Sequence, residues 1–87
     1  MPSNGVTGDG QARSGETKRD AFKRLAVRRT NAVLDKLRIL SNCANPYAYE
    51  WDDDDIRQIF GSIDQEVKLA RARFQQVQRS RREFKLQ

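Results

Sequence analysis

The residues of this chain that could do chemistry are its cations and its carboxylates. The sequence contains 17 Lys and Arg, 12 Asp and Glu, and no His, which gives a net charge of +5. A surplus of positive charge favours a polyanionic partner such as the phosphate backbone of nucleic acid. No Ser or Cys stands beside an evident base, and no glycine-rich phosphate loop appears. The sequence therefore predicts a protein that is not an enzyme and that uses no cofactor.

Positive charge is concentrated in two segments of the chain. Residues 16–31 carry a net charge of +4 and residues 68–87 carry +6, whereas residues 32–67 carry −5. Cations at the start of a helix interact unfavourably with the helix dipole. Because such an unfavourable arrangement is typical of functional sites, the cations of the first segment indicate a binding function. No spacing indicates base reading, so we predict non-specific binding to the backbone of DNA or RNA. The candidate residues are Lys18, Arg19, Lys23, Arg24, Arg71, Arg79, Arg81, Arg82 and Lys85.

Four carboxylates stand in a row from Asp52 to Asp55. A calcium-binding loop places its ligands at alternate positions around a central Gly, and this run lacks that spacing. An Asp at the start of a helix caps it, and further Asp residues in the first turn interact favourably with the helix dipole. We therefore interpret the run as a helix start and predict no metal site.

The longest periodic pattern of the chain predicts a helix over about residues 52–84. Its spacings alternate between four and three residues, which places these positions on one side of a helix. They are Ile56, Phe60, Ile63, Val67, Ala70, Phe74, Val77, Arg81 and Phe84. The stripe is narrow and needs one neighbouring helix. Gly61 lies within this helix at some cost to stability. Because it has no side chain, the helix that contains Val33 could approach it closely.

A first helix is predicted over about residues 17–42, with Thr17 as its cap. Its apolar positions cover more than half of the helical circumference, so this helix is expected to be surrounded. Residues 1–15 hold four of the five glycines and are predicted to form a disordered tail. Asn45-Pro46 interrupts the helical pattern, so residues 43–51 form the connection. The predicted fold is all-α.

These elements predict an antiparallel two-helix hairpin over residues 16–87. Residues whose numbers sum to about 96 then lie opposite one another, such as Phe22 and Phe74. In this register Arg29 lies opposite Glu66, and the two basic segments meet at the open end. Like charges then face one another across the hairpin.

Helix 17–42 retains apolar residues beyond those that such a hairpin uses. An exposed apolar patch on so small a protein is typical of an interface. We predict a homodimer that forms a four-helix bundle, with the first helix of each copy at its centre. The predicted interface residues are Leu25, Ala32, Ile39, Val27 and Leu34.

The connection offers a second functional hypothesis. Tyr47, Tyr49 and Trp51 alternate along it, and aromatic residues are common anchors of protein interfaces. They would let the chain act as a protein–protein adaptor or inhibitor. Equally, these rings could cover the end of the hairpin. Salt-dependent retention on nucleic acid separates the two hypotheses.

The remaining features concern location and origin. No apolar run approaches the roughly 20 residues that span a bilayer, and no signal-peptide pattern opens the chain. The single Cys43 excludes an internal disulfide and fits a reducing compartment, so a cytoplasmic protein without a membrane partner is expected. Several short stretches resemble small helical proteins of bacteria and phages, a resemblance that implies such a source and no activity. They are Arg29-Thr30-Asn31, residues 41–45, residues 47–50, Asp55-Ile56 and Ile59-Phe60.

Overall fold

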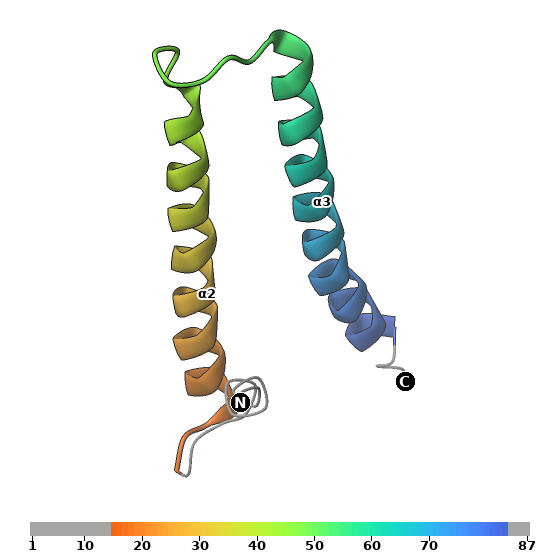
Figure 1. The fold of residues 1–87 in the computed structure, drawn as a ribbon. Helices are drawn as coiled ribbons and strands as arrows, with labels where there is room; N and C mark the ends of the chain where they lie inside the picture. Colours follow the sequence, from red (N-terminus) through yellow and green to blue (C-terminus); the bar gives the residue numbers. More distant parts are fainter. Residues whose placement is uncertain (1–14, 84–87) are drawn as a thin grey trace, which may run out of the picture. The chain divides into compact units, whose positions relative to one another are not determined.

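The computed structural model describes residues 15–83, and all regular structure in this range is helical (Figure 1). Helix α2 spans Lys18–Ser41, the 3-10 turn η1 spans Asn42–Ala44, and helix α3 spans Asp53–Glu83. The prediction of an all-α chain is confirmed for these residues. The chain divides into two units, Met1–Ala48 and Tyr49–Gln87, and each is described by itself. Residues 1–14 of the tail predicted over residues 1–15 lie outside the described residues, as do Phe84 and Lys85 with their predicted roles.

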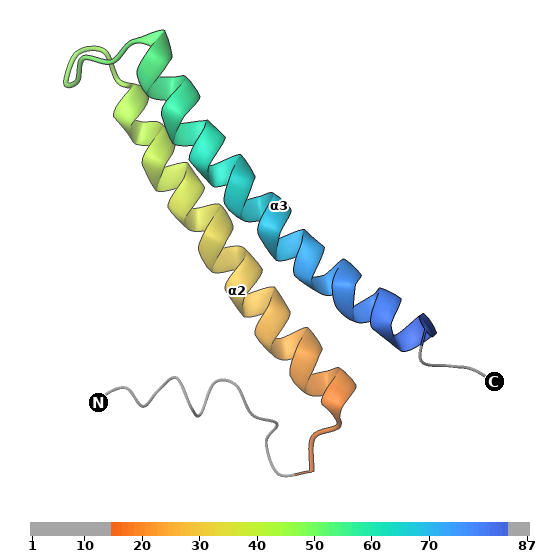
Figure 2. The ribbon, with the colours of Figure 1, turned by 90° about the vertical axis from the view of Figure 1, so that its right-hand side faces the viewer.

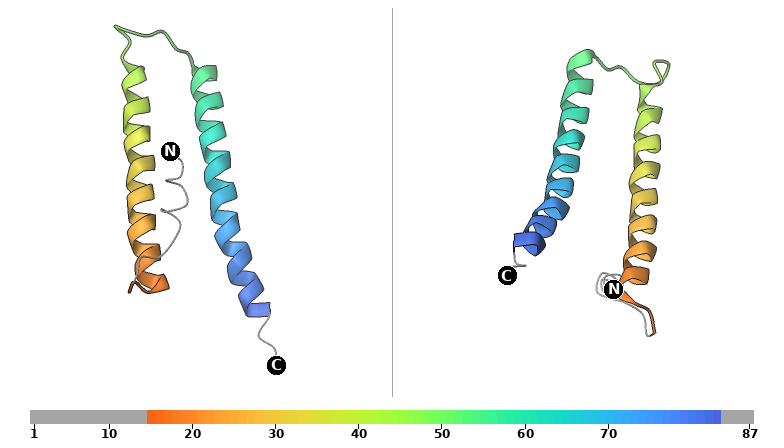
Figure 3. Two further views of the ribbon diagram at one scale, coloured as in Figure 1. Left: turned by 60° about the horizontal axis from the view of Figure 1, so that its bottom comes forward. Right: turned by 180° about the vertical axis from the view of Figure 1, so that it is seen from behind.

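Helix α2 starts at a side-chain cap. Thr17 has extended backbone angles, and its hydroxyl accepts a hydrogen bond from the Asp20 amide at 3.0 Å. This bond satisfies one of the amides that a helix leaves open in its first turn. Gly15, two residues earlier, has a φ of 81°, a conformation that glycine adopts without strain. The helix then runs unbroken to Ser41 (Figure 3).

The chain turns sharply after η1. The Asn45 side-chain oxygen accepts a hydrogen bond from the Tyr47 amide at 3.0 Å, and the Asn45 carbonyl accepts one from the Ala48 amide at 3.2 Å. Pro46 occupies the second position of this turn, where its fixed φ fits. The turn therefore presents Tyr47 at its tip.

Helix α3 starts at the aspartate run. The Asp52 carboxylate accepts a hydrogen bond from the Asp55 amide at 2.9 Å, and the Asp55 carboxylate accepts one from the Asp52 amide at 3.0 Å. This reciprocal pair is a capping box, with Asp in place of the usual Ser and Glu. Gly61 does not interrupt the helix, which continues to Glu83 (Figure 2).

Apolar burial in the described residues is slight. Ala21 is the buried apolar residue, and the large apolar side chains of both helices retain substantial exposure. On α3, Phe60, Val67 and Val77 are between 42% and 49% exposed. They belong to the periodic apolar stripe of α3, which we call the apolar seam. It consists of Ile56, Phe60, Ile63, Val67, Ala70, Phe74 and Val77. Such exposure on a regular stripe is typical of a surface that packs on another helix.

Candidate nucleic-acid interface

The six basic residues of α3 between positions 68 and 82 do not all lie on one face of the helix. Lys68, Arg71, Arg79 and Arg82 lie within about 80° of one another, since each residue advances a helix by about 100°. We call these four residues the basic stripe. Its centre lies about 110° around the helix from the centre of the apolar seam. Of the other arginines, Arg81 is in line with the seam and Arg73 lies on its far flank.

The basic stripe has the exposure and the length that phosphate binding needs. All four side chains are exposed, and residues 68–82 include no acidic side chain. The stripe extends about 21 Å along the helix axis, the length of about six nucleotides of one B-DNA strand. A row of cations of this length can neutralise several consecutive phosphates and release their counterions. Lys68 was not among the predicted residues, although its spacing of three residues from Arg71 indicates the same face.

The cations at the start of α2 differ in their surroundings. Lys18, Arg19 and Lys23 are exposed, and the Arg19 guanidinium lies over the Phe22 ring, 5.7 Å from its centroid. This cation–π contact holds the guanidinium beside the Phe22 ring while the Arg19 side chain remains exposed. These three residues can therefore contact an anion.

Arg24 is already engaged by a carboxylate. Its Nε and Nη2 donate hydrogen bonds to the two carboxylate oxygens of Glu16, at 2.9 Å and 3.1 Å. The side chains of Arg24 and Glu16 are only 23% and 14% exposed. Such a two-point pair offsets the charge of the guanidinium and occupies two of its five N–H donors. Glu16 lies before the helix, outside the helical periodicity, and this is why sequence analysis missed the pair.

The structure describes the two basic sets in separate units. Lys18, Arg19 and Lys23 belong to Met1–Ala48, and the basic stripe belongs to Tyr49–Gln87. The predicted meeting of the two segments at the open end of a hairpin therefore stays a prediction, as does the pairing of Arg29 with Glu66.

The three aromatic residues of the connection are likewise divided between the units. Tyr47 is 98% exposed at the tip of its turn, and Tyr49 and Trp51, which lie in the second unit, are 55% and 44% exposed. The structure thus assigns them no common patch. A ring as exposed as that of Tyr47 does not cover apolar surface within its own unit.

The predicted dimer residues of α2 are mostly exposed. Val27, Leu34 and Ile39 are exposed, as is Ala32, and Leu25 is half-buried. This exposure is compatible with an interface, and nothing in the described residues shows what covers it.

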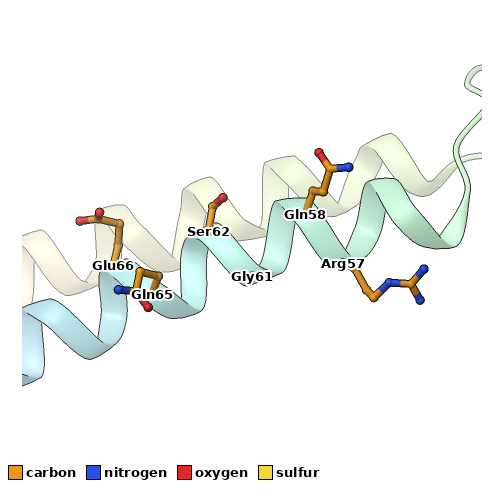
Figure 4. A pocket seen from close by; sticks show the side chains of 6 residues that line it. All are labelled: Arg57, Gln58, Gly61, Ser62, Gln65 and Glu66. Carbon is orange, nitrogen blue, oxygen red and sulfur yellow. The ribbon is translucent and has the colours of Figure 1, made fainter.

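An open depression lies on the polar side of α3 (Figure 4). It is lined by Arg57, Gln58, Gly61, Ser62, Gln65 and Glu66. A Cβ placed on Gly61 would meet nothing within 4 Å. The depression therefore results from the missing Gly61 side chain and has no walls that could enclose a ligand.

Other kinds of site find little support in the described residues. Across residues 15–83, no three His, Cys, Asp or Glu side chains gather closely enough to hold a metal ion. Cys43 lies within η1 and is exposed. Neither α2 nor α3 has the length and hydropathy of a membrane-spanning helix over its described residues.

Comparison with protein families, curated proteins and solved structures finds no match to this chain. A function is therefore inferred from the chemistry of these surfaces alone.

Proposed function

We propose that the protein binds the backbone of nucleic acids non-specifically, with the basic stripe of α3 as its principal contact surface. The observation that supports this most is the alignment of Lys68, Arg71, Arg79 and Arg82 on one exposed face. A surface that served only solubility would intersperse both signs of charge, and this stretch of helix contains cations alone. The exposed cations at the start of α2 provide a second contact surface.

The mechanism is electrostatic. Each Lys or Arg that approaches a phosphate releases condensed counterions, and this entropy gain supplies the affinity. Arginine adds two-point hydrogen bonding to phosphate oxygens. The proposal includes no base reading, so affinity follows backbone charge density and not sequence.

The proposal is tested by titrating labelled duplex DNA and single-stranded RNA at low salt and following fluorescence anisotropy. Arg79→Gln with Arg82→Gln removes half of the basic stripe and should weaken binding about tenfold. Lys36→Gln with Arg38→Gln is the matched control, because it removes the same charge from α2 outside both contact surfaces. Equal losses in the two variants would show that only net charge matters and would contradict a stripe.

A protein–protein adaptor is the second candidate, and the exposure of Tyr47 favours it. An aromatic ring that is 98% exposed on a turn fixed by Asn45 resembles the anchor residues of interfaces. If the wild-type protein shows no affinity for DNA or RNA at low salt, this candidate replaces the first. Tyr47→Ala should then remove binding to the partner protein while leaving the helical signal unchanged.

The finer structural predictions accompany this proposal without being required by it. They are the antiparallel hairpin, the homodimer through α2 and a cytoplasmic location. A distance between spin labels at residues 36 and 58 would test the hairpin, since residues whose numbers sum to about 96 are then close together.

A further inference from the structure

The apolar seam of α3 is flanked by two rows of charged residues that change sign along the helix. One flank carries Asp64 and Arg71, and the other carries Glu66 and Arg73. All four side chains are exposed, and none forms an ion pair along the described part of α3. Residues 53–67 hold five acidic side chains and one basic, a net charge of −4, and residues 68–82 hold six basic and none acidic.

We propose that α3 pairs with α3 of a second copy as an antiparallel coiled coil. In such a pair, seam positions of one helix lie opposite seam positions of the other in fixed layers. The central layers place Val67 opposite Ala70 of the second copy, and the next place Ile63 opposite Phe74. Phe60 then lies opposite Val77. Every layer within residues 60–77 is apolar, and each contact occurs twice because the pair is symmetric.

The same register pairs the charges that flank the seam. Asp64 lies opposite Arg71 of the second copy, and Glu66 lies opposite Arg73, which gives four contacts of opposite sign. The remaining flank positions, Arg57 opposite Gln78 and Ile59 opposite Ser80, bring no like charges together. A parallel pair would instead align the two acidic halves with each other and the two basic halves with each other. The charge pattern therefore favours the antiparallel arrangement.

The second copy also suits the seam better than α2 of the same chain. In the predicted hairpin, residues 16–31, with a net charge of +4, would face residues 68–82, with +6. When α3 pairs with itself in the antiparallel direction, residues 68–82, with a net charge of +6, lie opposite residues 53–67 of the second copy, with −4. Because the seam is narrow and needs one neighbour, these two arrangements are alternatives. The charges favour the second copy, and in this proposal it takes the place of α2 of the same chain as the neighbour of the seam.

This pairing leaves most of the basic stripe accessible. Lys68, Arg79 and Arg82 lie outside the seam and its flanks, and only Arg71 is shared with the interface. The inference therefore goes beyond the proposed function and can be tested without nucleic acid.

The test uses Glu66→Arg and Arg73→Glu, each alone and then mixed in equal amounts. Glu66 and Arg73 are seven residues apart on one helix, about 10.5 Å, so they cannot pair within a chain. Each single variant places two like-charge contacts in the dimer and should weaken it about tenfold or more. A mixture of the two variants restores both pairs of opposite charge, so a heterodimer of wild-type strength should form. Sedimentation equilibrium at micromolar concentration measures the strength of dimerisation for each single variant and for their mixture.

Two controls keep the result interpretable. Lys68→Glu changes the charge by the same amount as Arg73→Glu but lies outside the interface, so it should leave dimerisation unchanged. Far-UV circular dichroism checks that every variant remains helical. The proposal is overturned if the wild-type protein is a monomer, if the mixture is no stronger than the single variants, or if Lys68→Glu is as damaging as Arg73→Glu. Single variants that dimerise as strongly as the wild type would also overturn it and would favour the α2 interface.

Discussion

Asp52 and Asp55 exchange hydrogen bonds between side chain and main chain at the first turn of α3. Both carboxylates accept amide protons that the helix leaves without intrahelical partners. The favourable dipole interaction of Asp53 and Asp54 with the same turn adds to this. The four aspartates therefore serve to start helix α3, through capping hydrogen bonds and through the helix dipole.

Replacing the capping residue Asp52 should therefore lower the stability of the protein more than replacing its neighbour Asp53. We expect Asp52→Ala to lower the free energy of unfolding by about 1 kcal/mol, because the Asp55 amide loses its acceptor. Asp53→Ala, which removes a charge but no capping bond, should cost about 0.5 kcal/mol or less. Thermal melts followed by circular dichroism compare the two, with Asp52→Asn as the variant that keeps an acceptor. Equal losses for Asp52→Ala and Asp53→Ala would contradict the capping role.

The Arg24–Glu16 pair makes a second prediction at this scale. Arg24→Ala should lower stability by about 1 kcal/mol, because it removes a partly buried two-point pair. It should change nucleic-acid affinity little, since the guanidinium already binds Glu16. Lys23→Ala, one position away and exposed, should weaken affinity about twofold to fivefold. Denaturant titration and anisotropy separate the effects, and a loss of affinity in Arg24→Ala equal to that in Lys23→Ala would refute the assignment.

The helices themselves were largely predictable from sequence. Thr17, Asn45-Pro46 and the aspartate run act locally, and α2 and α3 begin and end within about two residues of the predicted limits. The neighbour of each helix was not predictable in the same way. The seam of α3 specifies a face and a spacing, and both α2 and a second α3 meet that requirement. The basic stripe was predicted in part, since Arg71, Arg79 and Arg82 belong to it, whereas Arg81 lies on the seam.

Gly61 allows a prediction about α3 as an element. It lies on the polar side of the helix, where an added Cβ meets nothing within 4 Å. Gly61→Ala should therefore stabilise the protein by about 1 kcal/mol through helix propensity alone. Thermal melts at matched concentration measure this. Destabilisation would show that another helix approaches at Gly61, as the sequence-based hypothesis of contact near Val33 requires.

For the molecule as a whole, the basic stripe and the apolar seam of α3 are two surfaces that would bind their partners through different interactions. The proposed binding through the basic stripe would depend on counterion release, whereas the proposed pairing through the seam would depend on apolar burial with flanking ion pairs. Raising the salt concentration from low to about 0.5 M should thus abolish nucleic-acid binding. The same change should weaken self-association only severalfold, because salt screens the flanking pairs but not the apolar layers. Parallel loss of both activities would contradict two separate surfaces.

The salt dependence of affinity tests most directly the proposal that exposed cations on α3 bind nucleic-acid backbones. The measurement is the slope of log affinity against log salt concentration for duplex DNA, for the wild type and for Arg79→Gln with Arg82→Gln. The four stripe contacts contribute up to about −3.6 to this slope, and the double variant should be shallower by up to about 1.8. A slope near zero, or no binding at the lowest salt concentration, would contradict the claim.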